Sequence, residues 1–401
     1  MSKRRAGADA LTHPPPMDDL LIVGGGPIGA TLALALRASG LDYRVFDARP
    51  RGGLSAGERT LALAHNARLT FERIGIWGRL ASVTSIDTID ISQKGGFGVT
   101  QLTAREAGVP ALGYVVRYGE LQAALDAALA EAGIDVLFGH QVEAVRTSPA
   151  AASVVVRSGV GDQSQATERA ARLVVVADGS GELLPDIPRR KIDYRQHALT
   201  GFVTASAMRP GTAFERFTTD GPAALLPYAS GYALVWTATP ERASALLALD
   251  DAQFLAALQH HFGDRVGRFT SIAQRKSFPL LLQFATQIAG ERAVVLGNAA
   301  QSLHPIAGQG FNLGLRDAWT LAQRLLDTAR DDVGSAQQLR AYAQARRVDR
   351  WAGMAVTHGL VSAFASNHPL LAGPRGLGLT LIDSIPPLKR AFARGMLNGL
   401  R

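Results

Sequence analysis

The sequence contains no cysteine among its 401 residues. This absence excludes disulfides, thiolate metal sites, iron–sulfur clusters and cysteine nucleophiles. No run of about 18 uncharged apolar residues occurs, so no membrane-spanning helix is expected. The histidines show no triad or metal-ligand spacing, and no metal site is predicted. Residues 1–17 lack the apolar segment of a secretory signal and are expected to form a flexible lead-in.

Charged residues are scarce, at 19% of the chain, whereas hydrophobic residues make up 47%. This balance and the length predict a globular protein of about two or three domains. The net charge of +8 comes almost wholly from one end, because residues 340–401 hold nine basic and two acidic residues, a net +7. Nucleic-acid binding would need basic residues spread over a face or a recognised module, so no nucleic-acid partner is predicted.

The same C-terminal region carries a regular apolar pattern. Leu388, Phe392, Met396 and Leu400 recur every four residues, with basic residues off that line. One interpretation is a basic amphipathic helix that lies on an anionic membrane surface. The alternative, which the sequence leaves equally open, is a C-terminal helix docked on its own domain.

Short apolar runs outline a Rossmann-like α/β domain. A strand at 20–23, a helix at 28–38 and a strand at 43–46 form a β-α-β unit, which implies a parallel sheet. Further elements expected here are a helix around 121–132, strands at 134–138, 153–157, 172–177 and 293–296, and a helix from about 310 to 329. The polar stretch 158–168 is expected to form a hairpin turn.

Residues 84–115 and 190–275 differ in character, because they are richer in Thr, Phe and Tyr and contain alternating patterns. Alternation predicts a mostly antiparallel β-sheet inserted into the first domain. The predicted fold class is therefore α/β: a Rossmann-like nucleotide-binding domain, the inserted substrate domain and a C-terminal helical segment. The expected boundaries are 1–17 for the flexible N-terminus, 18–83, 116–189 and 276–355 for the nucleotide-binding domain, 84–115 and 190–275 for the substrate domain, and 356–401 for the C-terminal segment.

Residues 24–29 read Gly-Gly-Gly-Pro-Ile-Gly and fit G-x-G-x-x-G between a strand and a helix. Gly24 allows the tight turn, Gly26 lets the backbone approach a pyrophosphate, and Gly29 lets the helix pack on the strand. Free amides at the helix start can then hold the phosphates. Asp47 ends the second strand, 18 residues after Gly29, where it can accept hydrogen bonds from a ribose. The chain has one such fingerprint, so one dinucleotide is expected to be held permanently.

Two later motifs also follow strands. Asp178 and Gly179 can make a turn and present a carboxylate. Residues 297–314 lead into the late helix, and Pro305 and Gly310 lie where the backbone can approach a flat ligand closely. The helix N-terminus supplies free amides and a partial positive charge. Aimed at the N1–C2=O edge of an isoalloxazine, this helix end would stabilise the reduced flavin.

In order and separation, the three motifs resemble those of the single-component (class A) FAD-dependent aromatic hydroxylases, over about residues 18–400. The third motif usually reads G-D-A-A-H in that family, whereas residues 297–301 read Gly-Asn-Ala-Ala-Gln. This variant is similar to the 2-polyprenyl-6-methoxyphenol hydroxylase branch of ubiquinone biosynthesis. The other segments that look like that branch are 59–63, 214–218, 221–222, 226–227 and 303–314.

The resemblance implies bound FAD, transient NADPH or NADH, and hydroxylation of a polyprenylated methoxyphenol by O2 through a C4a-hydroperoxyflavin. The Rossmann-like domain is then the FAD-binding domain. The residues implied in cofactor binding are Gly24, Gly26, Pro27, Gly29, Asp47, Arg59, Arg117, Asp178, Gly297, Asn298, Gly308, Gln309, Phe311 and Asn312. Pro305 and Gly310 are implied in catalysis. The candidates for substrate contact on the inserted sheet are Phe217, Leu226, Pro227 and Tyr228.

The sequence departs from the family pattern at four places. Asn298 stands where most relatives have an aspartate, and Asp47 stands where glutamate is usual. Gly119 replaces a common arginine, whose phosphate contact Arg117 is expected to supply. After Asp178 and Gly179 the frequent Ser-x-x-Arg continuation is missing, so a role of this loop in NADPH docking is left open.

Two alternatives accompany the leading hypothesis. One is a hydroxylase of the same fold that acts at another ring position or on another phenol. The other is a non-catalytic FAD-binding scaffold of the ubiquinone pathway, which the uncharged Asn298 and the altered second motif favour. The expected partners are the phenol and O2, with other ubiquinone-biosynthesis proteins and peripheral membrane contact as further candidates. The expected location is cytoplasmic, or peripheral on the inner face of the membrane.

Overall fold

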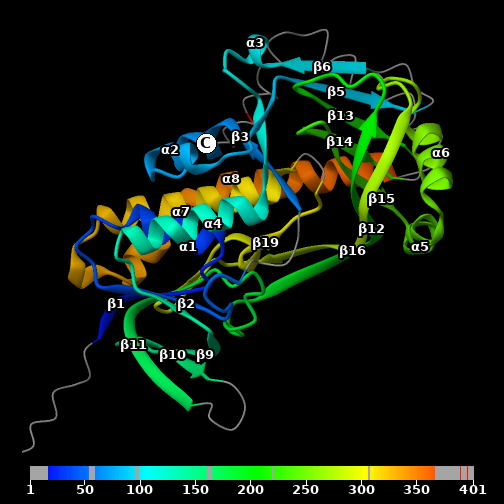
Figure 1. The fold of residues 1–401 in the computed structure, drawn as a ribbon. Helices are drawn as coiled ribbons and strands as arrows, with labels where there is room; N and C mark the ends of the chain where they lie inside the picture. Colours follow the sequence, from blue (N-terminus) through cyan, green and yellow to red (C-terminus); the bar gives the residue numbers. More distant parts are fainter. Residues whose placement is uncertain are drawn as a thin grey trace, which may run out of the picture.

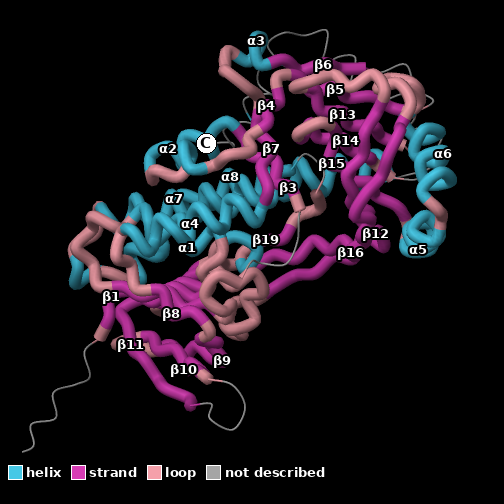
Figure 2. Tube along the Cα trace, viewed as in Figure 1, coloured by secondary structure: helices cyan, strands magenta, loops and turns pink. Residues whose placement is uncertain are grey.

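The computed structural model describes residues 17–53, 59–94, 99–159, 165–218, 221–305 and 308–365, together with Lys389 and Gly395. Two lobes are joined by a pair of long antiparallel strands, β12 (Arg189–Ala205) and β16 (Phe269–Ala285), as Figure 1 shows. One lobe combines helices with a largely parallel sheet, and the other is built on an antiparallel sheet (Figure 2). Most of the expected flexible N-terminus, residues 1–16, lies outside the described residues.

The first sheet forms because short apolar runs bury both of their faces. Its described strands run in the order β17-β18-β11-β1-β2-β8, with β10 paired to β11 and β9 paired to β10. The neighbours from β18 to β8 are parallel. Leu20, Leu21 and Ile22 of the central strand are fully buried. The strands are β1 (Asp18–Val23), β2 (Tyr43–Asp47), β8 (Val136–Phe138), β9 (His140–Thr147), β10 (Ala152–Ser158), β11 (Gln165–Val176), β17 (Ala289–Gly290) and β18 (Ala293–Val295).

A layer of helices packs against this sheet (Figure 1). In that layer α1 contacts α4 and α7, and α7 contacts α8. The long elements are α1 (Pro27–Ala35), α4 (Tyr118–Glu131), α7 (Gln309–Leu326) and α8 (Ala336–Ala365). The shorter elements are α2 (His65–Arg73), α3 (Ala104–Ala107), η1 (Trp77–Arg79), η3 (Gly297–Ala299) and η5 (Arg330–Asp332).

The predicted hairpin of β10 and β11 is confirmed, with Val155 opposite Glu168 in antiparallel register. Strand β11 starts at Gln165, so part of the stretch expected as a turn is strand instead. The reason is that the outer residues of this ribbon, such as Glu168, face solvent and are polar. Polar composition therefore marked an exposed strand as well as a turn.

The second sheet has the described strand order β19-β16-β12-β15-β14-β13-β5-β6. All pairs in it are antiparallel except β13 with β5. Helices α5 (Pro240–Ala248) and α6 (Asp251–Phe262) cover one face, where Leu225, Trp236 and Phe254 share a buried core. The remaining strands are β5 (Thr88–Gln93), β6 (Val99–Thr103), β13 (Thr212–Phe217), β14 (Ala223–Tyr228), β15 (Gly231–Ala238) and β19 (Gln301–Ser302).

The structure differs from the expected domain boundaries at two places. Strand β4 (Thr84–Ile86) pairs with β7 (Gly113–Arg117), which also pairs with β3 (Thr60–Ala64), in a separate small sheet. Strand β16 continues through the boundary expected at residue 276, because its ladder with β12 is shared by both lobes. The predicted fold class is nevertheless confirmed, since a Rossmann-like α/β domain carries an inserted, mostly antiparallel sheet and a C-terminal helical segment.

Almost all of the C-terminal apolar pattern, including Leu388, Phe392, Met396 and Leu400, lies outside the described residues. Lys389 is described, and its Nζ lies 3.1 Å from Oε1 of Glu106 on α3. Its side chain is only 14% exposed. At this position the tail therefore contacts the inserted domain, and the choice between the two interpretations of the pattern stays a prediction.

Candidate functional site

A cavity of about 590 Å³ opens where the parallel strands β1, β2, β11 and β18 end. Residues that follow these strands, namely Gly24, Asp47, Asp178 and Gly297, all line it. The chain leaves β1 toward β2 on one side, whereas β11 pairs with β1 on the other side. Such a switch point at the carboxyl ends of parallel strands is where α/β folds bind nucleotides.

The fingerprint glycines divide into those that pack and those that face the cavity. A Cβ at Gly24, which has φ +103°, would lie 2.5 Å from the carbonyl oxygen of Ala177. A Cβ at Gly29 would overlap the carbonyl oxygen of Gly24. At Gly26, by contrast, the nearest atom to such a Cβ is the Tyr118 hydroxyl oxygen at 3.9 Å. Gly26 thus presents bare backbone to the cavity, as close approach of a pyrophosphate requires.

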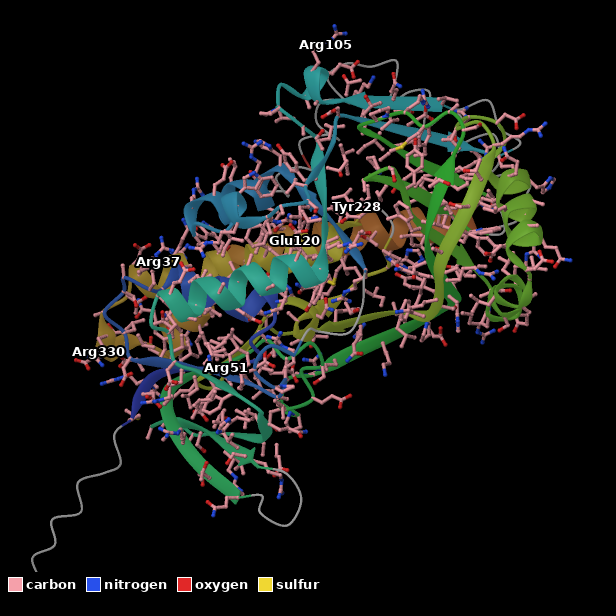
Figure 3. All side chains as sticks on the ribbon, viewed as in Figure 1. Arg37, Arg51, Arg105, Glu120, Tyr228 and Arg330 are labelled. Carbon is pink, nitrogen blue, oxygen red and sulfur yellow. The ribbon has the colours of Figure 1, made fainter. Side chains whose placement is uncertain are left out.

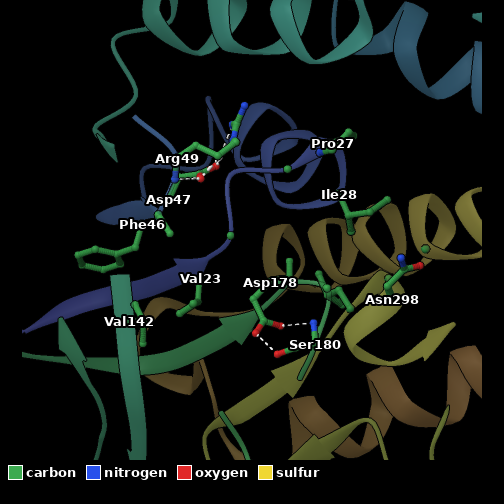
Figure 4. A pocket seen from close by; sticks show the side chains of 18 of the residues that line it. Val23, Pro27, Ile28, Phe46, Asp47, Arg49, Val142, Asp178, Ser180 and Asn298 are labelled. Atoms are coloured by element: carbon green, nitrogen blue, oxygen red, sulfur yellow. Dashed lines mark hydrogen bonds and ion pairs between the residues drawn. The ribbon is translucent and has the colours of Figure 1, made fainter. Parts of the chain in front are cut away.

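The acid at the end of β2 is held by an arginine that sequence reasoning missed. Nη2 of Arg49 lies 2.8 Å from Oδ2 of Asp47, and the amide of Arg49 donates to Oδ1 at 2.8 Å (Figure 4). Arg49 also lines the cavity and reaches the carbonyl oxygen of Gly25 at 3.2 Å. The signal in the sequence was a cation two residues after the predicted ribose ligand. The pair orients the Asp47 carboxylate, which retains lone pairs for a hydroxyl donor.

Asp178 closes the turn after β11. Its carboxylate accepts from the amides of Ser180 and Gly181 and from the Ser180 hydroxyl, the last at 2.5 Å (Figure 4). Ser180, Glu182 and Leu183 join Asp178 in the cavity lining. The carboxylate therefore shapes the loop that forms one wall.

The loop after β18 meets the start of α7. A Cβ at Gly314 would lie 2.8 Å from Cα of Gly297, so only glycines allow the loop and helix to touch. Gly308 caps α7 at φ +59°, in the left-handed region. Gly310 and Phe311 in the first turn line the cavity, and so does the exposed Asn298. The dipole of this helix end and the amides of its first turn make the region favourable for negative charge.

Asn312, expected to bind the cofactor, is only 4% exposed and is used inside the protein. Its Oδ1 accepts from the amide of Ala64 at 2.8 Å, and its Nδ2 donates to the carbonyl oxygens of Ala62 and Gly308. The amide group therefore fixes strand β3 against the start of α7. A direct cofactor contact of Asn312 stays a prediction.

The expected basic residues lie at different places. The guanidinium carbon of Arg59 stacks 4.1 Å from the ring centre of Tyr118, and both residues line the cavity. Arg117 is outside that lining, and its guanidinium carbon lies 5.9 Å from the ring centre of Tyr228. The structure thus brings Arg59, and not Arg117, to the nucleotide cavity.

The substrate candidates lie on two faces of the second sheet. Leu226 and Tyr228 pack in one cluster with Val115 of β7. Figure 3 shows Tyr228 on the side of the second sheet toward the first lobe. Phe217 lies in a neighbouring cluster with Ile91, Leu102 and Val361 of α8. Pro227 has the parity of Leu225, which packs under α5 and α6, so strand alternation turns it to the opposite face. Pro227 therefore departs from the other three.

His304 lies within the third motif, residues 297–314, and is buried. Burial lowers the pKa of His304 to about 4, so the ring is neutral at neutral pH. Tyr194 of β12 lies edge-on to the His304 ring, with ring centroids 5.4 Å apart. The Tyr194 hydroxyl lies 3.2 Å from Nδ1 of His358 on α8. These rings pack the segment before α7 against the second lobe.

The cavity lining gathers most, but not all, of the sequence-predicted residues. Those in the lining are Gly24, Gly26, Pro27, Asp47, Arg59, Asp178, Gly297, Asn298, Gly310 and Phe311. Those outside it are Gly29, Arg117, Pro305, Gly308, Gln309 and Asn312. The residues that sequence reasoning missed include Arg49, Tyr118, His140, Gln141, Ser180 and Glu182. His140 and Gln141 carried no motif, and only the return of β9 beside the sheet brings them to the cavity.

Comparison with solved structures shows the same fold at low sequence identity. The p-nitrophenol 4-monooxygenase PnpA of Pseudomonas putida DLL-E4 superimposes with a TM-score of 0.76 at 15% identity, over 96% of this chain and 99% of the other. PqsL of P. aeruginosa, solved with 2-aminobenzoylacetate, gives a TM-score of 0.73 at 23% identity, over 91% of this chain and all of that one.

Comparison with known sequences shows the family. A model described as FAD binding domain matches residues 17–356. The ubiquinone hydroxylase UbiL of Rhodospirillum rubrum is 33% identical over 393 residues, which cover 96% of this chain and 90% of the relative. The 3-demethoxyubiquinol 3-hydroxylase of Escherichia coli is 34% identical over 185 residues, 45% of this chain and 47% of that protein. The chain therefore belongs to the FAD binding domain family, among the flavin-dependent aromatic monooxygenases related to the ubiquinone hydroxylases.

Proposed function

We propose that this protein hydroxylates the aromatic ring of a polyprenylated methoxyphenol in ubiquinone biosynthesis, using FAD, O2 and NADPH or NADH. The observation that carries the proposal is the shared position of the three motifs. The fingerprint turn, the Asp178 turn and the start of α7 line one cavity at the carboxyl ends of the parallel strands. A flavin dinucleotide needs this combination of a phosphate cradle, a ribose acceptor and a helix end.

The residues present fit FAD. Bare backbone at Gly26 and Gly310, where an added Cβ would meet no atom closer than 3.8 Å, leaves room for close approach of a flat or charged group. Asp47 would accept from a ribose, and Asn298 would accept from the ribityl chain through its amide oxygen. Bound FAD supplies the electron transfer and oxygen activation that ring hydroxylation needs.

The substrate would lie between the second sheet and the first lobe. Phe217, Leu226 and Tyr228 belong to apolar clusters there, and on substrate binding they would orient the phenol ring and exclude water from it. The nicotinamide donor would dock transiently, because the chain has a single dinucleotide fingerprint.

The test is the intermediate that accumulates in a deletion strain, together with assays of the purified protein. We expect a flavin absorption spectrum, NADPH oxidation that the phenol accelerates, and accumulation of an unhydroxylated polyprenyl methoxyphenol. A purified protein without flavin, or one that never oxidises NADPH with any quinone precursor, would contradict the proposal.

The second candidate is hydroxylation at another ring position. It is supported by two relatives: one is a ubiquinone hydroxylase whose name gives no ring position, and the other is a 3-demethoxyubiquinol 3-hydroxylase. A different accumulated precursor in the same deletion strain would favour it.

Among the described residues, the helices are each too short or too polar to cross a bilayer. Because a polyprenyl tail is insoluble in water, we propose that the protein meets its substrate at a membrane surface or receives it from another protein of the pathway. Sedimentation with liposomes that carry the phenol would test this contact.

A further inference from the structure

A network of buried, hydrogen-bonded polar side chains lies behind the loop that carries Gly297 and Asn298. Its members come from the loop itself, from α7 and from α8, and each is at most 6% exposed. They are Gln301, Asp317, Arg346, Asp349 and Arg350.

Gln301 is the centre of this network. Its Nε2 donates to Oδ2 of Asp317 at 2.6 Å, and its Oε1 accepts from Nε of Arg350 at 2.7 Å. Arg350 also donates to the carbonyl oxygen of Ala285 at 3.1 Å and that of Ala300 at 3.5 Å. The loop is thus tied to α7 through Asp317, to α8 through Arg350, and to the end of β16 through Ala285.

Asp317 lies one turn beyond Gly314 on the helix face that also carries Gly310. Gly310 and Gly314 line the cavity, as do Gly297 and Asn298 of the loop. The hydrogen bond between Gln301 and Asp317 therefore joins the two elements that form the helix end of the cavity. A loss of this bond would let the loop move relative to α7.

The two arginines and two aspartates of this network balance formally, but the partly buried Arg316 of α7 adds a third guanidinium group. Asp317 pairs with Arg346 at 2.7 Å, and Asp349 pairs with both Arg346 and Arg316 at 2.7 Å. Within the part of the chain that the structure describes, Arg350 is in ion-pair contact with no carboxylate. Three guanidinium groups thus face two carboxylates. A buried and unpaired charge is costly, so its retention needs a reason.

We propose that Arg350 and Gln301 are positioning residues for the flavin: they fix the loop 297–301 against α7, and the positive charge of Arg350 raises the reduction potential of bound FAD. This inference rests on the proposed function. Arg189 of β12 donates to the carbonyl oxygen of Ala299 and stays in every variant below, so the measured changes belong to Arg350 and Gln301.

The test compares Arg350→Met, Arg350→Lys and Gln301→Met with the wild-type holoenzyme, and Arg347→Met serves as an exposed control on the same helix. The readouts are the midpoint potential of bound FAD and its dissociation constant. Arg350→Met should shift the potential to a more negative value, whereas Arg350→Lys, which keeps the charge, should restore it. Gln301→Met should weaken FAD binding by about tenfold, the effect of losing hydrogen bonds with a charged group, and leave the potential unchanged.

An equal shift of the potential in Arg350→Lys and Arg350→Met would overturn the role of the charge. Unchanged FAD affinity in Gln301→Met would overturn the positioning role, and that variant keeps its meaning even if Arg350→Met does not fold. A wild-type protein that binds no FAD would contradict the proposed function instead. The hydrogen-exchange rates of the amides 297–301 in the apoprotein would then still report whether the buried network holds the loop.

Discussion

Gly26 and Gly29 lie three residues apart at the start of α1, yet their surroundings are opposite. Gly26 has an ordinary φ of −63° and faces the cavity, whereas Gly29 touches the backbone of Gly24. A side chain at Gly26 therefore costs little in folding but occupies the space of the pyrophosphate. A side chain at Gly29 forces the first turn away from β1.

We predict that Gly26→Val weakens FAD binding by at least about tenfold, or about 1.4 kcal/mol. The same change should alter the unfolding free energy of the apoprotein by less than about 1 kcal/mol. Gly29→Ala should lower that free energy by about 1–3 kcal/mol, as overpacking does. Flavin fluorescence titration and urea denaturation measure the two quantities. Equal effects of both variants on FAD affinity and stability would contradict this division.

His261 on α6 is a buried titratable group far along the chain from the motifs. It is 3% exposed, its ring lies 4.8 Å from that of Trp236, and its Nε2 has no hydrogen-bond partner in the described chain. Burial, with nearby Lys94 and Arg216, lowers the pKa of His261 to about 3. The folded protein thus keeps this ring neutral where the unfolded chain, with a pKa of 6.5, takes up a proton.

Because the folded pKa is depressed, the stability from neutral His261 is present above pH 6.5 and is lost as the pH falls toward 3. Between neutral pH and pH 5 this group should remove about 2 kcal/mol of the unfolding free energy. In His261→Gln that part of the pH dependence should disappear. Urea denaturation at both pH values provides the comparison, and identical pH profiles for the two proteins would refute the prediction.

At the scale of elements, β14 decides which side chains can meet the substrate. Leu226 and Tyr228 face β4 and β7, whereas Leu225 faces α5 and α6. Leu247 on α5 is also partly buried but packs on the far side of the same sheet. Leu226 and Leu247 therefore form a matched pair, because they are similarly buried but lie on opposite faces of the sheet.

We predict that Leu226→Gln raises the KM for a polyprenyl phenol about tenfold or more, because it removes roughly 1.5–3 kcal/mol of apolar contact. FAD affinity should stay unchanged, since Leu226 is outside the nucleotide cavity. Leu247→Gln should leave the KM as it is. Steady-state kinetics of both variants test whether the face of β14 toward β4 and β7 contacts the substrate. An equal rise of the KM in both would show that the sheet is merely destabilised.

At the scale of the whole molecule, the cavity joins segments from distant parts of the chain. Residues near 24, 47, 118, 178, 297 and 310 meet there, and the loop near 297 is also tied to β16 and α8. A ligand bound at such a junction stabilises all of these segments at once. It binds the folded protein alone, because the unfolded chain does not bring them together.

FAD removal should therefore lower the melting temperature of the protein. At a free FAD concentration about 100 times the dissociation constant, binding adds about 2.7 kcal/mol to the unfolding free energy. Thermal denaturation of the apoprotein with and without FAD should thus differ by several degrees, and Gly26→Val, with binding at least about tenfold weaker, should reduce the difference to about half or less at the same FAD concentration. Coincident melting curves for wild type with and without FAD would show that the cavity does not hold it.

The architecture followed from local sequence to a large degree. Apolar runs such as 20–23 and 293–296 are buried strands because their side chains leave no polar face, and the glycine spacing at 24–29 produced the expected turn. The small sheet of β3, β4 and β7 was not expected, because three short strands from separate segments pair there. Pairing over such distances has no signature within any one segment.

What the sequence alone determined is the set of local conformations: where strands end, where helices begin, and where glycine lets the backbone come close to a ligand. Only the tertiary structure decided the partners. Arg49 pairs with Asp47, Asn312 accepts a hydrogen bond from the Ala64 amide of β3, and Arg350 donates to Gln301, 49 positions away in the sequence. The physical reason is that backbone conformation depends on near neighbours, whereas hydrogen bonds and charges act between whichever groups the folded chain brings together.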